Sequence, residues 1–95
     1  MDPVAKKYLK YYPKDATVIT DFFTKEKYFD VTSVKAKVVT SIAMFYDLED
    51  PLKFARDIYD CLDENGIWQL EQSYMPSMIK NCSYDTICHE HLEYY

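Results

Sequence analysis

Hydrophobic and polar residues change their spacing several times along the chain, and each change predicts a new element of secondary structure. Asp2 and Pro3 are typical of the cap and the first turn of a helix, which we expect to extend to about Tyr12. The β-branched run Ala16–Thr20 predicts a short buried strand. Thr24–Phe29 follows as a short helix with the threonine as its cap.

The second half of the chain continues this alternation. Ala36–Met44 is largely apolar and predicts a strand that is buried on both faces. Asp50 and Pro51 indicate the start of a third helix, which Asn65-Gly66 should close as a left-handed cap. Ile67–Tyr74 predicts a further strand, and the residues after it are irregular or weakly helical. Within the third helix, apolar residues recur at helical spacing: Leu52, Ala55, Ile58, Tyr59 and Leu62.

This order of elements predicts an α/β fold in one domain over residues 1–95. Strands that alternate with helices through short connections form a parallel, doubly wound sheet, here of about three strands with flanking helices. Ligands of such sheets bind beyond the carboxyl ends of the strands. We therefore expect Asp21–Phe23, Ser41–Asp47, Glu71–Tyr74 and the C-terminal segment to gather along one edge of the sheet.

The composition narrows the classes of function. Hydrophobic residues make up 48% of the 95 residues, which favours a folded protein over a disordered one. The net charge of −5 argues against a nucleic-acid partner, and no apolar run is long enough for a membrane span. Three cysteines without paired spacing favour a reduced, cytoplasmic protein. A single glycine, Gly66, is too few for a phosphate-binding glycine-rich loop.

Both histidines of the protein lie near its end, on either side of Glu90. Histidine titrates near neutrality and a neighbouring carboxylate can orient it, so this segment is the leading candidate for acid–base chemistry. Taken alone, the pair His89 and His91 is read more simply as structural or surface residues.

Several stretches carry a resemblance to a known family: Asp50–Phe54 (DPLKF), Cys61–Trp68 (CLDENGIW), Leu70–Tyr74 (LEQSY) and Tyr84–Tyr95 (YDTICHEHLEYY). The chain resembles class I S-adenosylmethionine-dependent methyltransferases, and more closely the sugar C-methyltransferases that act on nucleotide-linked keto-deoxysugars. Those proteins carry a Glu-x-Pro-Tyr strand end followed by an aromatic-Asp-Thr-Ile-Tyr-His-Glu-His segment. The resemblance runs over nearly the whole chain, and the His-Glu-His segment is its specific part. It implies a partial Rossmann-like methyltransferase fold.

The resemblance also implies a cofactor, S-adenosylmethionine, and residues that bind it. Asp2 would hold the ribose hydroxyls. Asp21 would accept a hydrogen bond from the adenine amino group, with Phe22 against the base. Ser41 would line the methionine end of the cofactor.

On the substrate side, the resemblance implies that a histidine removes the proton next to the ketone of a nucleotide-linked sugar. His91 is the expected base, with His89 beside it, and Glu90 would raise the basicity of His91 or hold its tautomer. Tyr74 would face the same sugar. The ketone would stabilise the carbanion as an enolate, which attacks the methyl group of the sulfonium.

The chain departs from the family pattern at several points. Cys88 stands where the family has a tyrosine that polarises the substrate, and Ser73 replaces the proline of the strand end. The family's first strand and glycine-rich loop have no counterpart in the chain. We therefore expect part of a methyltransferase, truncated at both ends and inactive alone. Exposed sheet edges would favour a homo-oligomer.

Two other functions stay open. The chain could be a non-catalytic α/β module that self-associates through its tyrosine-rich faces, or a small metal-binding protein that uses the histidines with Cys82 or Cys88. No CxxC spacing and no third certain ligand are present, so we predict no metal site. Asp2 and Asp21 also have simpler roles as cap and turn residues, and Tyr74 as a packing residue.

Overall fold

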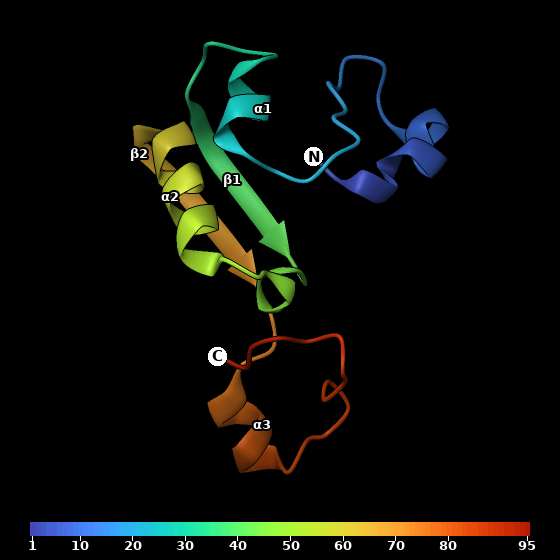
Figure 1. The fold of residues 1–95 in the computed structure, drawn as a ribbon, viewed down its shortest axis with the longest axis vertical. Helices are drawn as coiled ribbons and strands as arrows, with labels where there is room; N and C mark the ends of the chain where they lie inside the picture. Colours follow the sequence, from blue (N-terminus) through green and yellow to red (C-terminus); the bar gives the residue numbers. More distant parts are fainter. The chain divides into compact units, whose positions relative to one another are not determined.

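The computed structural model describes residues 1–95, and the chain divides into two compact units, Met1–Ser33 and Val34–Tyr95 (Figure 1). Each unit has its own helices, and the second contains a sheet. The protein is thus a mixed α/β structure. None of its helices is both long enough and apolar enough to cross a membrane.

Two short helices, separated by irregular and extended chain, make up the first unit. The 3-10 helix η1 (Pro3–Tyr11) starts at the predicted place, with Asp2 as its cap. The helix α1 (Lys25–Phe29) is capped by Thr24, whose hydroxyl oxygen accepts from the backbone N–H of Lys27 at 3.3 Å. Both predicted starts are confirmed, although the first helix has the tighter 3-10 winding.

The predicted strand Ala16–Thr20 is absent. These residues pair with no neighbouring strand. Instead, the carbonyl oxygen of Ile19 accepts from the backbone N–H of Asp2 at 3.0 Å. The strand prediction was wrong because β-branched residues favour a pleated surface only where another strand offers a hydrogen-bonding ladder.

A parallel two-stranded sheet forms the framework of the second unit. Its strands are β1 (Ala36–Ile42) and β2 (Leu62–Glu71), connected through the helix α2 (Pro51–Cys61). The parallel pairing is confirmed, with two strands in place of about three. The 3-10 turn η2 (Phe45–Asp47) follows β1, and the helix α3 (Met75–Asn81) follows β2 (Figure 1).

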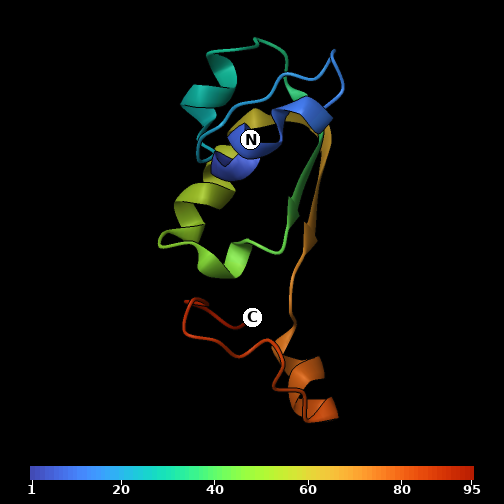
Figure 2. The same ribbon diagram turned by 90° about the vertical axis from the view of Figure 1, so that its right-hand side faces the viewer.

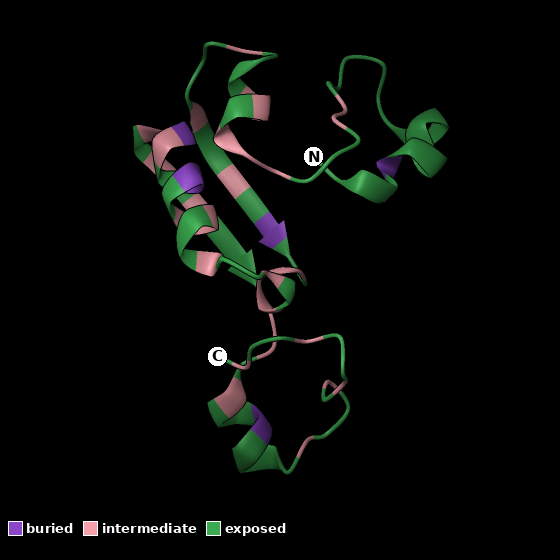
Figure 3. Ribbon diagram, in the orientation of Figure 1, coloured by how far each residue is buried: buried purple, intermediate pink, exposed green.

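One face of this sheet is covered and the other is open. The helix α2 lies along one face (Figure 2). On the open face, the side chains of Val38, Ile42 and Ile67 are 60%, 62% and 63% exposed. The prediction that Ala36–Met44 is buried on both faces was therefore wrong, because the second unit supplies a helical layer to one face only (Figure 3).

The junction between α2 and β2 also differs from its prediction. The helix ends at Cys61, and Asn65-Gly66 lies inside β2 without a positive φ at the glycine. Gly66 is instead a place of close approach, since an added Cβ would lie 2.8 Å from the carbonyl oxygen of Ala36. A bulge interrupts the strand pairing next to this contact. The glycine therefore serves strand packing and not helix capping.

A small core holds α2 against the sheet. Ile58 and Cys61 of α2 are fully buried. The rings of Phe45, Phe54 and Trp68 pack edge-on or tilted, with centroids 5.6 to 6.2 Å apart. This cluster joins the turn after β1 to α2 and β2. Ring packing therefore holds η2 in place.

Candidate functional site

The histidine-containing segment, Ser83–Tyr95, folds back onto the turn that follows β1. The carbonyl oxygen of Tyr46, in η2, accepts from the backbone N–H groups of Leu92 at 2.9 Å and Glu93 at 3.1 Å. The segment therefore lies beyond the carboxyl end of β1 (Figure 1). In parallel sheets, this is the region where ligands bind.

Two further contacts tie the end of this segment to its surroundings. The backbone N–H of Met75 donates to the carbonyl oxygen of Tyr95 at 2.5 Å, which joins the segment to the start of α3. The Tyr95 ring packs 5.2 Å from the ring of Phe45. Burial raises the pKa of the Tyr95 phenol above its ordinary value, and the nearby charge of Glu93 adds to this effect. The contact with Phe45 makes Tyr95 a packing residue of this segment.

His91 is the best-packed member of the candidate catalytic set. Its ring centroid lies 4.1 Å from that of Tyr46, with the planes tilted by 36°, and 6.0 Å from that of Tyr94. The ring nitrogen Nδ1 is buried and has no hydrogen-bond partner, while Nε2 is not fully buried. Nε2 is therefore the less buried of the two ring nitrogens of His91.

The other predicted substrate-side residues do not join His91. Glu90 is exposed and makes no hydrogen bond or ion pair with His91, so the expected pairing of the two is not formed. His89 is exposed as well. Tyr74 is 60% exposed and serves α3 through its backbone, because its carbonyl oxygen accepts from the N–H of Met78 at 3.1 Å.

The predicted cofactor residues are divided between the two units. Asp2, Asp21 and Phe22 belong to the first unit. The carboxylate of Asp2 caps η1 by accepting from the Val4 N–H at 2.7 Å. Phe22 is 72% exposed and makes no ring contact.

Asp21 already has partners of its own. Its carboxylate contacts the Lys27 ammonium at 2.6 Å and accepts from the Phe22 N–H at 2.7 Å. The hydrogen bond from Lys27, followed by that from Phe22, holds the pKa of Asp21 below its ordinary value. A carboxylate with both bonds in place has less capacity left for an adenine amino group.

Ser41, the fourth cofactor candidate, is buried in the second unit. It is 5% exposed, and its hydroxyl accepts from the indole Nε1–H of Trp68 at 3.1 Å. With Asp2 and Asp21 engaged locally and Gly66 packed inside β2, these residues do not fit an S-adenosylmethionine site.

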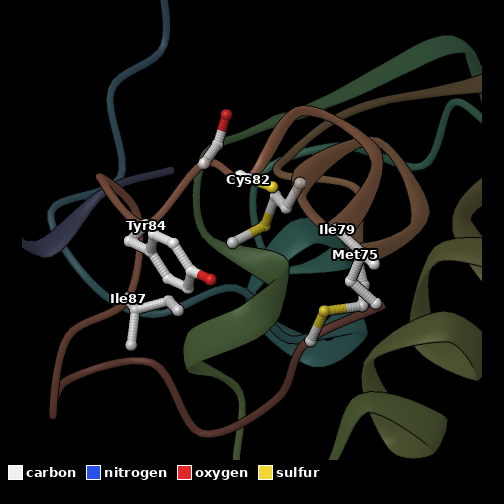
Figure 4. Close-up of a pocket in the computed structure, with 7 residues that line it drawn as sticks. Met75, Ile79, Cys82, Tyr84 and Ile87 are labelled. Atoms are coloured by element: carbon white, nitrogen blue, oxygen red, sulfur yellow. The ribbon is translucent and has the colours of Figure 1, made fainter.

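An apolar cavity of about 250 Å³ lies beside the histidine segment (Figure 4). Its wall combines α3 with the first residues of the C-terminal segment, and the hydroxyl of Thr86 donates to the Met78 sulfur at 3.3 Å next to it. The only thiol in the wall is that of Cys82. The cavity can hold a small apolar group, but no charged side chain converges on it. Its lining residues are Met75, Met78, Ile79, Cys82, Ser83, Tyr84 and Ile87.

Sequence reasoning assigned no individual role to three residues with unusual surroundings, although Tyr46 and Gln72 lie in the stretches expected at the edge of the sheet. Tyr46 packs on His91, and Gln72 has a buried, unpaired Oε1 atom. Asp57 is 5% exposed and accepts from the Lys53 ammonium at 2.6 Å. The i,i+4 spacing of Lys53 and Asp57 could have revealed their pair, whereas no local pattern points to the other two.

No group of three or more His, Cys, Asp or Glu side chains is arranged to hold a metal ion, so nothing in the geometry favours the metal-binding alternative. No protein-family model, curated protein or solved structure matches the chain. The interpretation of the site therefore depends on the residues and contacts described above.

Proposed function

We propose that the chain carries the base-bearing part of an S-adenosylmethionine-dependent C-methyltransferase with a Rossmann-like parallel sheet. Its substrate is a nucleotide-linked keto-deoxysugar. The observation that carries this proposal is the segment Tyr84–His91, which resembles the His-Glu-His segment of the sugar C-methyltransferases. In this proposal His91 is the general base.

The surroundings of His91 support this assignment. A general base needs one nitrogen that a substrate can reach and a ring that keeps its orientation. Nε2 of His91 is not fully buried, and the ring is packed against Tyr46 beyond the end of β1. His89 has no comparable packing, which favours His91 over its neighbour.

The step assigned to this chain is proton removal next to a ketone. The C–H bond breaks, the proton passes to Nε2 of His91, and the electron pair moves into the enolate whose charge rests on the ketone oxygen. Glu90 is exposed one residue away, and its carboxylate can approach the imidazolium once the proton has been transferred.

Hydrogen–deuterium exchange tests this step without methyl transfer. The protein is incubated in D₂O with a nucleotide-linked keto-deoxysugar, and deuterium at the carbon next to the ketone is followed by NMR. We expect exchange above the buffer rate for the natural chain, loss of that excess in His91→Gln, and its retention in His89→Gln. Equal rates in His91→Gln and the natural chain would contradict the proposal, as would exchange lost only in His89→Gln.

Calorimetric titration with S-adenosylmethionine examines the cofactor side separately. Because Asp2, Asp21 and Ser41 are engaged within the protein, we expect no measurable heat of binding. Saturable binding would show that these residues exchange their present partners for the cofactor, and would overturn our conclusion that they do not fit it.

A non-catalytic module that self-associates is the second candidate, and the open face of the sheet favours it. Val38, Ile42 and Ile67 form an exposed apolar row across both strands. Sedimentation velocity over a range of concentrations distinguishes the two functions. A monomer at every concentration would exclude the module, and association abolished by Ile67→Lys would support it.

A further inference from the structure

We propose that Tyr46 is a positioning residue for His91. This inference rests on the proposed function, because it concerns the orientation of the base assigned there. Tyr46 acts in two ways, through its backbone carbonyl and through its ring.

The carbonyl of Tyr46 fixes the chain immediately after His91. Its oxygen accepts from two successive N–H groups, those of Leu92 and Glu93, at 2.9 and 3.1 Å. Two donors on one oxygen restrain both the position and the direction of this backbone. The Leu92 N–H belongs to the peptide bond that follows His91. Its hydrogen bond to Tyr46 therefore fixes the backbone directly next to the Cα atom of His91.

The ring of Tyr46 then restrains the imidazole itself. A histidine base is usually oriented by a hydrogen bond at the nitrogen that does not react. In His91 that nitrogen, Nδ1, is buried without such a bond. The Tyr46 ring at 4.1 Å is the nearest aromatic contact of the imidazole, so packing takes the place of the missing hydrogen bond.

Tyr46 can do this because its own position is well supported. Its neighbour Phe45 packs against Phe54, Trp68 and Tyr95 with centroids 5.2 to 6.1 Å away. The turn η2 is thereby joined to α2, β2 and the end of the chain. A displacement of Tyr46 would require this cluster to repack.

NMR of the full chain tests the ring contact directly. With only two histidines, their ring protons can be assigned by comparison with His89→Gln. A ring at 4.1 Å should shift the His91 protons upfield of those of the exposed His89. We expect Tyr46→Phe to keep this shift and Tyr46→Leu to lose it. The single tryptophan, Trp68, reports by fluorescence whether each variant is folded.

The matched control is Tyr59→Leu, which removes a tyrosine ring that is 79% exposed. It should leave the His91 signals where they are. Natural-chain signals of His91 that coincide with those of His89 would overturn the inference. So would a Tyr46→Leu protein that is folded and keeps the shift. Should Tyr46→Leu fail to fold, Tyr46→Met, which also removes the ring and adds no histidine, takes its place in the same comparison.

The exchange assay separates this inference from the proposed function. We expect Tyr46→Leu to lower the rate at saturating sugar by roughly 10- to 100-fold, as misplacement of a reacting group does, and Tyr46→Phe to restore it. If His91→Gln exchanges as fast as the natural chain, the proposed function fails and the NMR result alone judges the ring contact. If His91→Gln is inactive while Tyr46→Leu keeps the full rate, the positioning role fails and the base assignment stands.

Discussion

The phenol of Tyr94 closes a loop on the backbone of Cys88: its oxygen accepts from the Cys88 N–H at 3.1 Å and its hydroxyl donates to the Cys88 carbonyl at 3.2 Å. The three residues His89, Glu90 and His91 lie within this loop. Cys88 takes part in this loop through its backbone N–H and carbonyl groups.

Tyr94→Phe should loosen this loop while leaving its ring in place. Two hydrogen bonds to a part-buried backbone are lost, and we expect the loop to open more easily by about 1–2 kcal/mol. Amide hydrogen exchange at Cys88 and His91 measures the change. Tyr59→Phe is the control, because that phenol is largely exposed. Equal exchange in both variants would contradict a role for the hydroxyl of Tyr94.

A second prediction concerns the pH dependence of the first unit. The hydrogen bond from Lys27, followed by that from Phe22, keeps the pKa of Asp21 below its ordinary value of 3.8. Because the pKa is lowered by folding, the Asp21–Lys27 contact stabilises the unit above about pH 4 and is lost as the pH falls through the lowered pKa.

Carboxyl-carbon NMR titration of Asp21 measures this effect. In Lys27→Met the pKa should rise towards 3.8, with the remaining bond from Phe22 keeping part of the shift. High salt should act in the same direction, since the pair is exposed. Lys10→Met is the control, because Lys10 lies over the Tyr11 ring and not beside an acid. An unchanged Asp21 titration in Lys27→Met would refute the assigned cause.

Local rules predicted the starts of helices and failed for features that depend on distant residues. Thr24 and Asp50 each cap a helix through a hydrogen bond from the backbone N–H three residues later, so short patterns suffice to predict these starts. Ala16–Thr20 has the composition of a strand but no partner. Asn65-Gly66 has the local pattern of a helix cap. The residue that requires the glycine is Ala36, about thirty residues earlier, so no local pattern could reveal this requirement.

The candidate site was predictable to a similar extent. Ligands of parallel sheets bind beyond the carboxyl ends of the strands, and this rule predicted a site at the end of β1. The histidine segment lies there. Tyr46 and His91 lie 45 positions apart in the sequence, so no spacing pattern predicts that their rings are in contact. Ser41 was expected at a ligand, and its hydroxyl proved to serve Trp68, because a buried indole N–H requires an acceptor.

Ser41→Ala should therefore destabilise the protein. The indole N–H of Trp68 would lose its acceptor in a part-buried position, at a cost of about 1–3 kcal/mol. Urea unfolding followed by Trp68 fluorescence measures this cost. The control is Thr40→Ala, the neighbouring exposed position of β1, for which we expect about 0.5 kcal/mol or less. Equal midpoints for the two variants would show that the Ser41–Trp68 bond contributes nothing.

Gln72→Met should not destabilise the protein, in contrast to Ser41→Ala. The Oε1 atom of Gln72 is buried without a hydrogen bond, so folding removes it from water without compensation. Methionine has a similar length and no atom that must be desolvated in this way. We expect the variant to be as stable as the natural chain or more stable by about 1 kcal/mol. Gln69→Met, on the exposed face of β2, is the matched control and should change stability by about 0.5 kcal/mol or less. A loss of more than about 1 kcal/mol in Gln72→Met alone would mean that the amide has a partner in solution, because removing one member of a buried hydrogen bond is costly.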